Sequence, residues 1–170
     1  MANTYTLIEA KTLGSSAASI DFTSIPQTYT DLILVYSART NAANRSDEAN
    51  LTFNNNASNY SWKMLYGSGT TAASAQDSAV SSIAGIQIPG GNSTASTFSN
   101  GQIYIPNYTG SNYKSVSSEA AQEDNQTTAY IKIVAGLWSN SAAITSVKLS
   151  GATGSFVQYS TFYLYGIKNS

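Results

Sequence analysis

Acidic side chains in two short stretches are the residues of this sequence whose types suit acid–base chemistry. Asp47 and Glu48 are adjacent, and Glu119, Glu123 and Asp124 form a second group. Two carboxylates hydrolyse a glycosidic bond when a sugar lies between them and their separation is fixed. Neighbouring acids in or near a predicted loop do not set that separation by themselves. We therefore interpret both groups as solvated loop charge.

Two missing residue types remove most other catalytic chemistry. The 170 residues include no histidine and no cysteine, so the commonest general base, the usual partner of a nucleophilic serine and all thiolate metal ligands are missing. The carboxylates could bind Ca²⁺ through oxygen, but their spacing does not match an EF-hand loop. We predict that the protein is not an enzyme and has no catalytic, cofactor-binding or metal-binding residues and no cofactor.

Aromatic side chains near predicted strand ends and loops are the other candidates for a binding site. The chain contains 12 tyrosines and 2 tryptophans, and such rings can stack on sugars while neighbouring amides and hydroxyls bond the sugar hydroxyls. Tyrosine and tryptophan are also enriched in protein interfaces, and we favour contact with another subunit over contact with a glycan. The candidate contact residues are Tyr60, Trp62, Tyr108, Tyr113 and Trp138.

Charge is scarce in this sequence. Charged residues make up 10 % of it, with eight Lys and Arg against nine Asp and Glu, so the surface must be rich in hydroxyl and amide groups. No basic stripe is present to neutralise phosphates, and we predict no nucleic-acid binding. No long apolar window or signal peptide is recognisable, so we expect no membrane contact. Sheets normally guard their edges with charge or proline. Their scarcity favours an assembly subunit, or edges covered by the protein's own loops.

The elements that would position these residues are short strands. The run from Asp31 to Thr40 holds five consecutive apolar residues and predicts a central strand buried on both faces at one end. We expect its counterpart in the run from Phe156 to Tyr165. Arg39, near the end of the first run, could pair with an acid in a neighbouring loop. The runs expected to form strands are 5–9, 18–22, 31–40, 51–53, 60–66, 83–88, 97–105, 113–121, 128–138, 144–149 and 156–165.

The strand pattern predicts an all-β protein. Residues 41–50 and 70–82 read as loops, although Ser74 and Asp77 could instead cap a short helix. In 128–138, the apolar Ile131 and Ile133 alternate with Tyr130 and Lys132, as in a strand with two different faces. No segment has the 3.6-residue period of a long helix. We expect one β-sandwich domain over residues 1–170, with a jelly roll as its topology.

Distinctive stretches at both ends and in the middle of the chain carry a resemblance to known proteins. They are Tyr-Thr-Leu-Ile at 5–8, the run 19–32, Asn54 with Asn-Tyr-Ser at 59–61, Ile-Tyr-Ile-Pro-Asn-Tyr at 103–108, Ala-Gly-Leu-Trp at 135–138 with Ala-Ile-Thr-Ser at 143–146, and Ser-Thr-Phe-Tyr-Leu-Tyr-Gly-Ile at 160–167. Across nearly the whole chain the sequence resembles a group of virion proteins from tailed bacteriophages, common in aquatic and cyanobacterial phages.

The resemblance implies a function as well as a fold. Such proteins look like compact jelly-roll sandwiches, and the implied role is a capsid decoration, or cement, protein on the outer surface of the virion head. Its partners would be the major capsid protein and further copies of itself, as a homotrimer or other small homo-oligomer. The alternative is a head-fibre, tail-fibre or spike domain that binds host-surface carbohydrate. Trp62, Tyr108 and Trp138 clustered in one concave patch would favour the glycan, and the same residues spread along a flat contact would favour cement.

Overall fold

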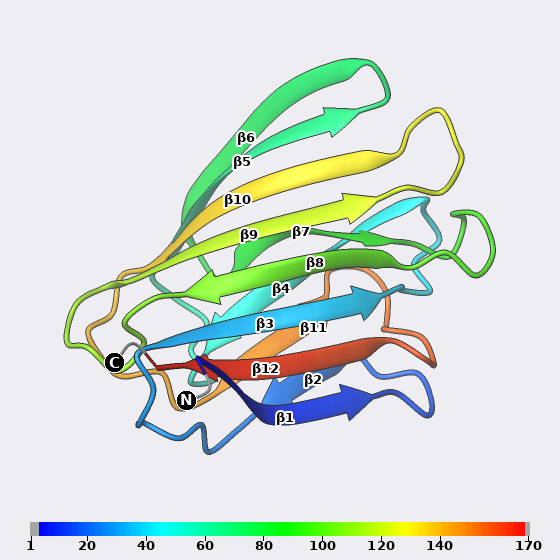
Figure 1. Cartoon of the computed structure of the whole chain (residues 1–170). Coiled ribbons are helices and arrows are strands. Elements are labelled where there is room, and N and C mark those ends of the chain that lie inside the picture. The colour runs from blue at the N-terminus through cyan, green and yellow to red at the C-terminus, as the bar shows by residue number, and fades with distance from the viewer. Residues whose placement is uncertain (1–3, 169–170) are drawn as a thin grey trace.

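Residues 4–168 are described by a computed structural model, in which two antiparallel β-sheets pack face to face (Figure 1). No helix long and apolar enough to cross a membrane occurs in this range. The strands are β1 (Tyr5–Thr12), β2 (Ser19–Phe22), β3 (Asp31–Ala38), β4 (Ser46–Phe53), β5 (Tyr60–Ser68), β6 (Thr71–Val80), β7 (Ile83–Pro89), β8 (Ser99–Ile105), β9 (Lys114–Gln122), β10 (Tyr130–Trp138), β11 (Val147–Gly151) and β12 (Thr161–Ile167).

The two sheets differ in size. The large sheet has eight strands in the order β1-β12-β3-β8-β9-β10-β5-β6, and the small sheet has four in the order β2-β11-β4-β7. In Figure 1 the large sheet faces the viewer and the small sheet lies behind it. One cluster of buried apolar side chains fills the space between them. The predicted all-β sandwich is confirmed, while the jelly-roll topology stays a prediction.

The central strand expected from the sequence is β3, and its neighbour is the expected C-terminal run. β12 pairs antiparallel with β3, with Leu164 opposite Leu34. Both leucines point into the core, and Ile33 is buried from the opposite side. On the side turned away from the core, burial ends at Val35, which is 37 % exposed, whereas Tyr36 and Ala38 on the core side stay buried. The prediction of a strand buried on both faces at one end is therefore confirmed.

Two segments predicted as loops contain strands. β6 occupies most of 70–82, and β4 begins at Ser46 inside the predicted loop 41–50. Neither the helix nor the loop expected around Ser74 forms, because Ser74 lies opposite Leu65 in the β5–β6 ladder. An exposed strand at the end of a sheet has no face that must be apolar, so its sequence lacks the alternation that identifies a strand. Conversely, the predicted strand 144–149 begins only at Val147.

β7 of the small sheet approaches the large sheet closely, because glycines at the contact have no side chains to keep the strands apart. It packs against β9 and β10 of the large sheet. Gly85 has a φ of +86°, and a Cβ built there would lie 2.7 Å from the Met64 Cε. A Cβ on Gly136 of β10 would lie 2.7 Å from the Ile83 Cδ1. These approaches bury β7 along almost its whole length.

Three aromatic rings, from β4, β5 and β10, form one part of the core between the sheets. The rings of Tyr60 and Trp138 stack with centroids 6.1 Å apart and an interplanar angle of 15°. The Phe53 ring lies 5.6 Å from that of Trp138. All three side chains are fully buried. The Tyr60 hydroxyl accepts a hydrogen bond from the Phe53 amide at 2.8 Å, so the polar end of this ring is satisfied within the turn after β4.

Burial of Tyr60 makes stability sensitive to alkaline pH. Desolvation raises its pKa from the ordinary 10.0 to about 12, although the Phe53 hydrogen bond acts in the opposite direction. A raised tyrosine pKa contributes stability that is complete below pH 10 and is lost as the pH rises towards 12. We expect urea unfolding from pH 8 to 12 to show the stability advantage over Tyr60→Phe shrinking above pH 10. A difference that stays constant to pH 12 would contradict this assignment.

Candidate interaction surface

The side of the large sheet turned away from the small sheet, here called the outer face, exposes large apolar side chains. Leu65 of β5 is 63 % exposed, and Ile131 and Ile133 of β10 are 61 % and 58 % exposed. Val35 on β3 and both Tyr5 and Leu7 on β1 are also exposed. A β-sandwich buries only one face of each sheet, so residues that alternate with the core residues along each strand must point outward.

Strand register aligns these side chains into rows across the sheet. Leu65 lies opposite Ile133, and Ile133 lies opposite Glu119. Gln102 follows on β8 and Val35 on β3. The row thus has apolar ends and a polar centre, at which the Gln102 Nε2 donates to the Glu119 Oε1 at 2.5 Å.

A shallow hollow lies across this row. It has a volume of about 370 Å³ and is bounded by Val35 on one side and by Ile131 and Ile133 on the other. Its floor includes Gly101 and Ala121, where small residues leave room. An apolar side chain of a partner protein would fit between these walls, because the polar Gln102–Glu119 pair is already satisfied by its own hydrogen bond.

A second row runs over the opposite half of the outer face. Leu7 lies opposite Tyr165, which lies opposite Ile33, which in turn lies opposite Tyr104. The Tyr104 hydroxyl donates to the Asp31 Oδ2 at 2.8 Å, and this hydrogen bond raises the pKa of Tyr104. This hydrogen bond holds the Tyr104 ring in place, so a contact with this ring would cost little side-chain entropy.

The outer face carries little exposed charge. Its five central strands are β3, β8, β9, β10 and β5. In these strands the exposed charged side chains are Lys63 on β5 and Glu119 on β9. Large apolar and aromatic residues with few charges are characteristic of the centre of a protein interface. Chemically, the surface offers dispersion contacts, ring faces and amide or hydroxyl hydrogen bonds.

The aromatic residues singled out in the sequence lie mostly inside the protein. Tyr60, Tyr108 and Trp138 are buried, with the Tyr108 hydroxyl donating to the Pro26 carbonyl. Trp62 is half-buried and Tyr113 is 62 % exposed. The structure therefore brings Tyr60 and Trp138 together in the core, and it forms neither an open aromatic patch nor a flat row from Trp62, Tyr108 and Trp138.

The acidic candidates are held by separate partners. Asp47 accepts hydrogen bonds from the Thr40 and Thr153 hydroxyls, each at 2.9 Å. Glu48 forms an ion pair with Lys132, whose side chain is 6 % exposed. These contacts join β4 to a loop and to the other sheet, so both acids act in the packing of the sandwich rather than as the loop charge we expected.

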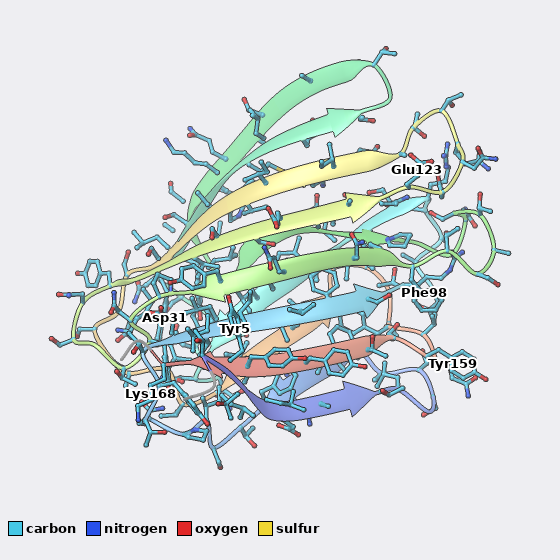
Figure 2. All side chains as sticks on the ribbon, in the orientation of Figure 1. Tyr5, Asp31, Phe98, Glu123, Tyr159 and Lys168 are labelled. Atoms are coloured by element: carbon cyan, nitrogen blue, oxygen red, sulfur yellow. The ribbon has the colours of Figure 1, made fainter. Side chains whose placement is uncertain are left out.

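The second acidic group is divided in the same way. Glu119 bonds Gln102 on the outer face, whereas the buried Asp124 lies 3.6 Å from the Arg45 Nη2. Figure 2 shows Glu123 in the loop after β9, at the other end of the sandwich from Asp31. Within residues 4–168, no three acidic side chains lie close enough together to hold a metal ion.

The outward-facing isoleucines of β10 are residues that sequence reasoning did not assign to a site. Their alternation with polar residues was visible, but an apolar face normally indicates the core side of a strand. Here the core side is instead formed by Lys132, Val134 and Trp138. Lys132 can point inward because Glu48 neutralises it and because its ammonium group lies 5.6 Å from the Tyr66 ring centroid.

Comparison with known proteins adds no further assignment. A scan against models of protein families finds no match to this chain, and a search of curated proteins finds no significant match.

Proposed function

We propose that this protein is a structural subunit of a bacteriophage virion, a decoration protein that binds the outer surface of the assembled head and stabilises it. The virion setting comes from the sequence resemblance. The observation that supports a binding role is the outer face, a weakly charged surface on which Leu65, Ile131 and Ile133 are exposed together. Val35 is exposed beyond the polar Gln102–Glu119 pair. Large apolar side chains that are exposed close together mark an interaction site.

Preferential binding explains how such a subunit stabilises a capsid. A ligand that binds the assembled lattice but not free subunits shifts the equilibrium towards the lattice by mass action. The outer face is built on paired strands, so little ordering is needed on contact. Its low charge would keep the binding weakly dependent on salt concentration.

The stoichiometry of purified virions tests this proposal. We expect the chain to be present in the virions of the phage that encodes it, at one copy per major capsid protein or a simple fraction of that number. Quantitative mass spectrometry of the purified particles measures the ratio. A few copies to a few dozen per particle would contradict decoration and favour a fibre or spike.

A variant of the outer face connects that stoichiometry to the surface. Ile133→Lys places a charge at the wall of the hollow without touching the core, and we expect it to abolish binding to particles that lack the protein. Tyr159→Lys is the matched control. It also replaces an exposed apolar side chain, but in the loop before β12 (Figure 2). Equal binding by both variants would place the contact elsewhere.

The carbohydrate-binding alternative has one observation in its favour. A groove of about 570 Å³ is lined by residues that include Trp62, Lys63, Gln76 and Asp77. The Trp62 ring packs towards the core, on the other face of the sheet from the Lys63 and Gln76 side chains. The ammonium and amide groups of Lys63 and Gln76 can form hydrogen bonds with sugar hydroxyls. Low copy number in the virion, together with glycan-array binding that Gln76→Ala abolishes, would support this alternative.

A further inference from the structure

One edge of this protein's sheets lacks the protection that the other three have. Edge strands expose unpaired N–H and C=O groups and are normally blocked by charge, bulges, shortness or cover. β1 carries the Glu9–Lys11 ion pair at 2.6 Å and a register shift between Leu7 and Glu9. β2 has four residues and includes Asp21. β7 is buried against the large sheet.

β6 is the remaining edge, and it is long and open. Its ten residues are exposed almost throughout, on both faces. The sequence Thr-Ala-Ala-Ser-Ala-Gln-Asp-Ser-Ala-Val holds no Lys, Arg or Pro and a single charge, Asp77. A register shift near Ser61 and a positive φ at Ala79 disturb only the far end. The regular part, 71–78, therefore remains available for pairing.

The hairpin geometry decides which groups of β6 are free. Gly69, at φ +56°, and Thr70 form a two-residue turn between the paired Ser68 and Thr71. In such a hairpin the flanking pair exchanges both of its hydrogen bonds. The Gly69 amide donates to Ala129 on the β10 side, consistent with odd-numbered β5 residues facing β10 and even-numbered ones facing β6. The N–H and C=O groups that point away from β5 then belong to Ala72, Ser74, Gln76 and Ser78.

We propose that β6 pairs antiparallel with β6 of a second copy of this chain around a two-fold axis, which joins the two large sheets into one. The register that uses all four outward residues places Ala72 opposite Ser78 and Ser74 opposite Gln76. It forms about eight main-chain hydrogen bonds between the copies. Ala75 then lies on the axis, opposite itself.

Side-chain complementarity is the reason for choosing a second copy as the partner. In this register Asp77 faces the small Ala73 of the other copy, so no like charges are opposed. Small Ala and Ser side chains on both strands allow close approach without clashes. An isologous contact needs one self-complementary surface and closes as a dimer. This pairing is independent of the virion role, since it uses the sheet edge and not the outer face.

Single cysteines test the register directly, because the chain has no cysteine of its own. Opposite residues in a non-hydrogen-bonded pair have Cα atoms about 4.5 Å apart, which a disulfide can bridge. We expect Ala75→Cys to give a disulfide-linked dimer as its main product on mild oxidation. Ala73→Cys, on the same strand and face, is the matched control and should remain largely uncrosslinked, since the two Ala73 residues lie well apart in this register.

Sedimentation of the full chain supplies the second measurement. We expect the unmodified protein to be a dimer, and Ser74→Lys combined with Gln76→Lys to weaken dimerisation roughly tenfold or more, because these positions oppose each other across the axis. The control combines Ser115→Lys with Ser117→Lys, which adds the same charge to the outer face on β9 and should leave the dimer intact.

Three outcomes would overturn the proposal. A protein that stays monomeric at high micromolar concentration would exclude self-pairing, and a strand of another protein would then be the candidate partner of the β6 edge. Dissociation by the β9 pair but not by the β6 pair would move the dimer to the outer face. Equal crosslinking of Ala73→Cys and Ala75→Cys would exclude the register. Thermal unfolding midpoints similar to that of the parent protein verify that each variant is folded.

Discussion

Replacing Trp138 by alanine is expected to lower the free energy of unfolding by about 3–5 kcal/mol. The side chain is 1 % exposed and is the largest of those that are fully buried. Its ring packs against both the Tyr60 and Phe53 rings, with centroid distances of 6.1 and 5.6 Å. Removing it leaves a cavity and also ends two ring–ring contacts, each of which is worth more than its buried area alone.

Replacing Trp138 by phenylalanine separates the effect of losing side-chain volume on stability from the effect of losing the indole N–H group. The Trp138 Nε1 is buried and has no hydrogen-bond partner among the described residues, so Trp138→Phe removes an unsatisfied donor while keeping an aromatic ring. We expect it to cost well under half as much as Trp138→Ala. Urea unfolding followed by far-ultraviolet circular dichroism measures both. A loss below about 1 kcal/mol for Trp138→Ala would show that the core can collapse around the site.

A single guanidinium group holds the loop between β7 and β8. Arg39 could have paired with an acid in a neighbouring loop, but its guanidinium group makes its four shortest hydrogen bonds to backbone carbonyls. The residue is 9 % exposed. Nη1 donates to the carbonyls of Thr94 at 2.8 Å and Thr97 at 3.0 Å, and Nη2 donates to those of Gly91 and Ser93, both at 3.0 Å. The planar fork of arginine suits this arrangement, because each terminal nitrogen offers two fixed N–H directions.

Replacing Arg39 by methionine is expected to lower the free energy of unfolding by about 3 kcal/mol, because several carbonyls lose a charged donor at once. Arg39→Lys should recover only part of this loss, since one ammonium group cannot reach all four oxygens. Hydrogen exchange should show faster opening of residues 90–98 in both variants. Lys63→Met is the control, because that cation is exposed and should change stability by less than about 0.5 kcal/mol. Unchanged exchange in the loop would contradict the anchoring role of Arg39.

The pairing of β3 with β12 was predictable because both strands carry dense apolar runs. Leu32, Leu34, Phe162 and Leu164 have no alternative but burial, and each lies in the core. The turn at 54–56 was predictable in part, because asparagine tolerates left-handed backbone. Asn54 and Asn55 adopt it, with φ of 53° and 52°, whereas Asn56 does not.

Sequence reasoning missed the strands in which apolar residues do not mark the buried side. β6 is exposed, so Ala, Ser and Thr suffice and no period marks the strand. β10 turns Ile133 outward and Lys132 inward, because Lys132 finds Glu48 across the core. Ion pairing between strands that lie far apart in the sequence cannot be read from either strand alone.

The candidate site shows the same limit. Tyr60 and Trp138 were chosen because they lie near strand ends, yet strand ends here are where the core closes around Phe53. The exposed apolar residues that form the outer face are Val35, Leu65, Ile131 and Ile133, which had been read only as strand formers. Which side of a strand faces solvent depends on how the second sheet docks, and local alternation carries no information about docking.

The position of β12 links the fold to the order in which the chain is made. β12 lies between β1 and β3 in the large sheet, so these two early strands have no common neighbour until residues 161–167 have been synthesised. At ~5–20 residues per second, the edges of β1 and β3 that β12 will cover stay unpaired for seconds. The large sheet is therefore closed by long-range pairing, which is intrinsically slow and leaves strand edges exposed to aggregation in the meantime.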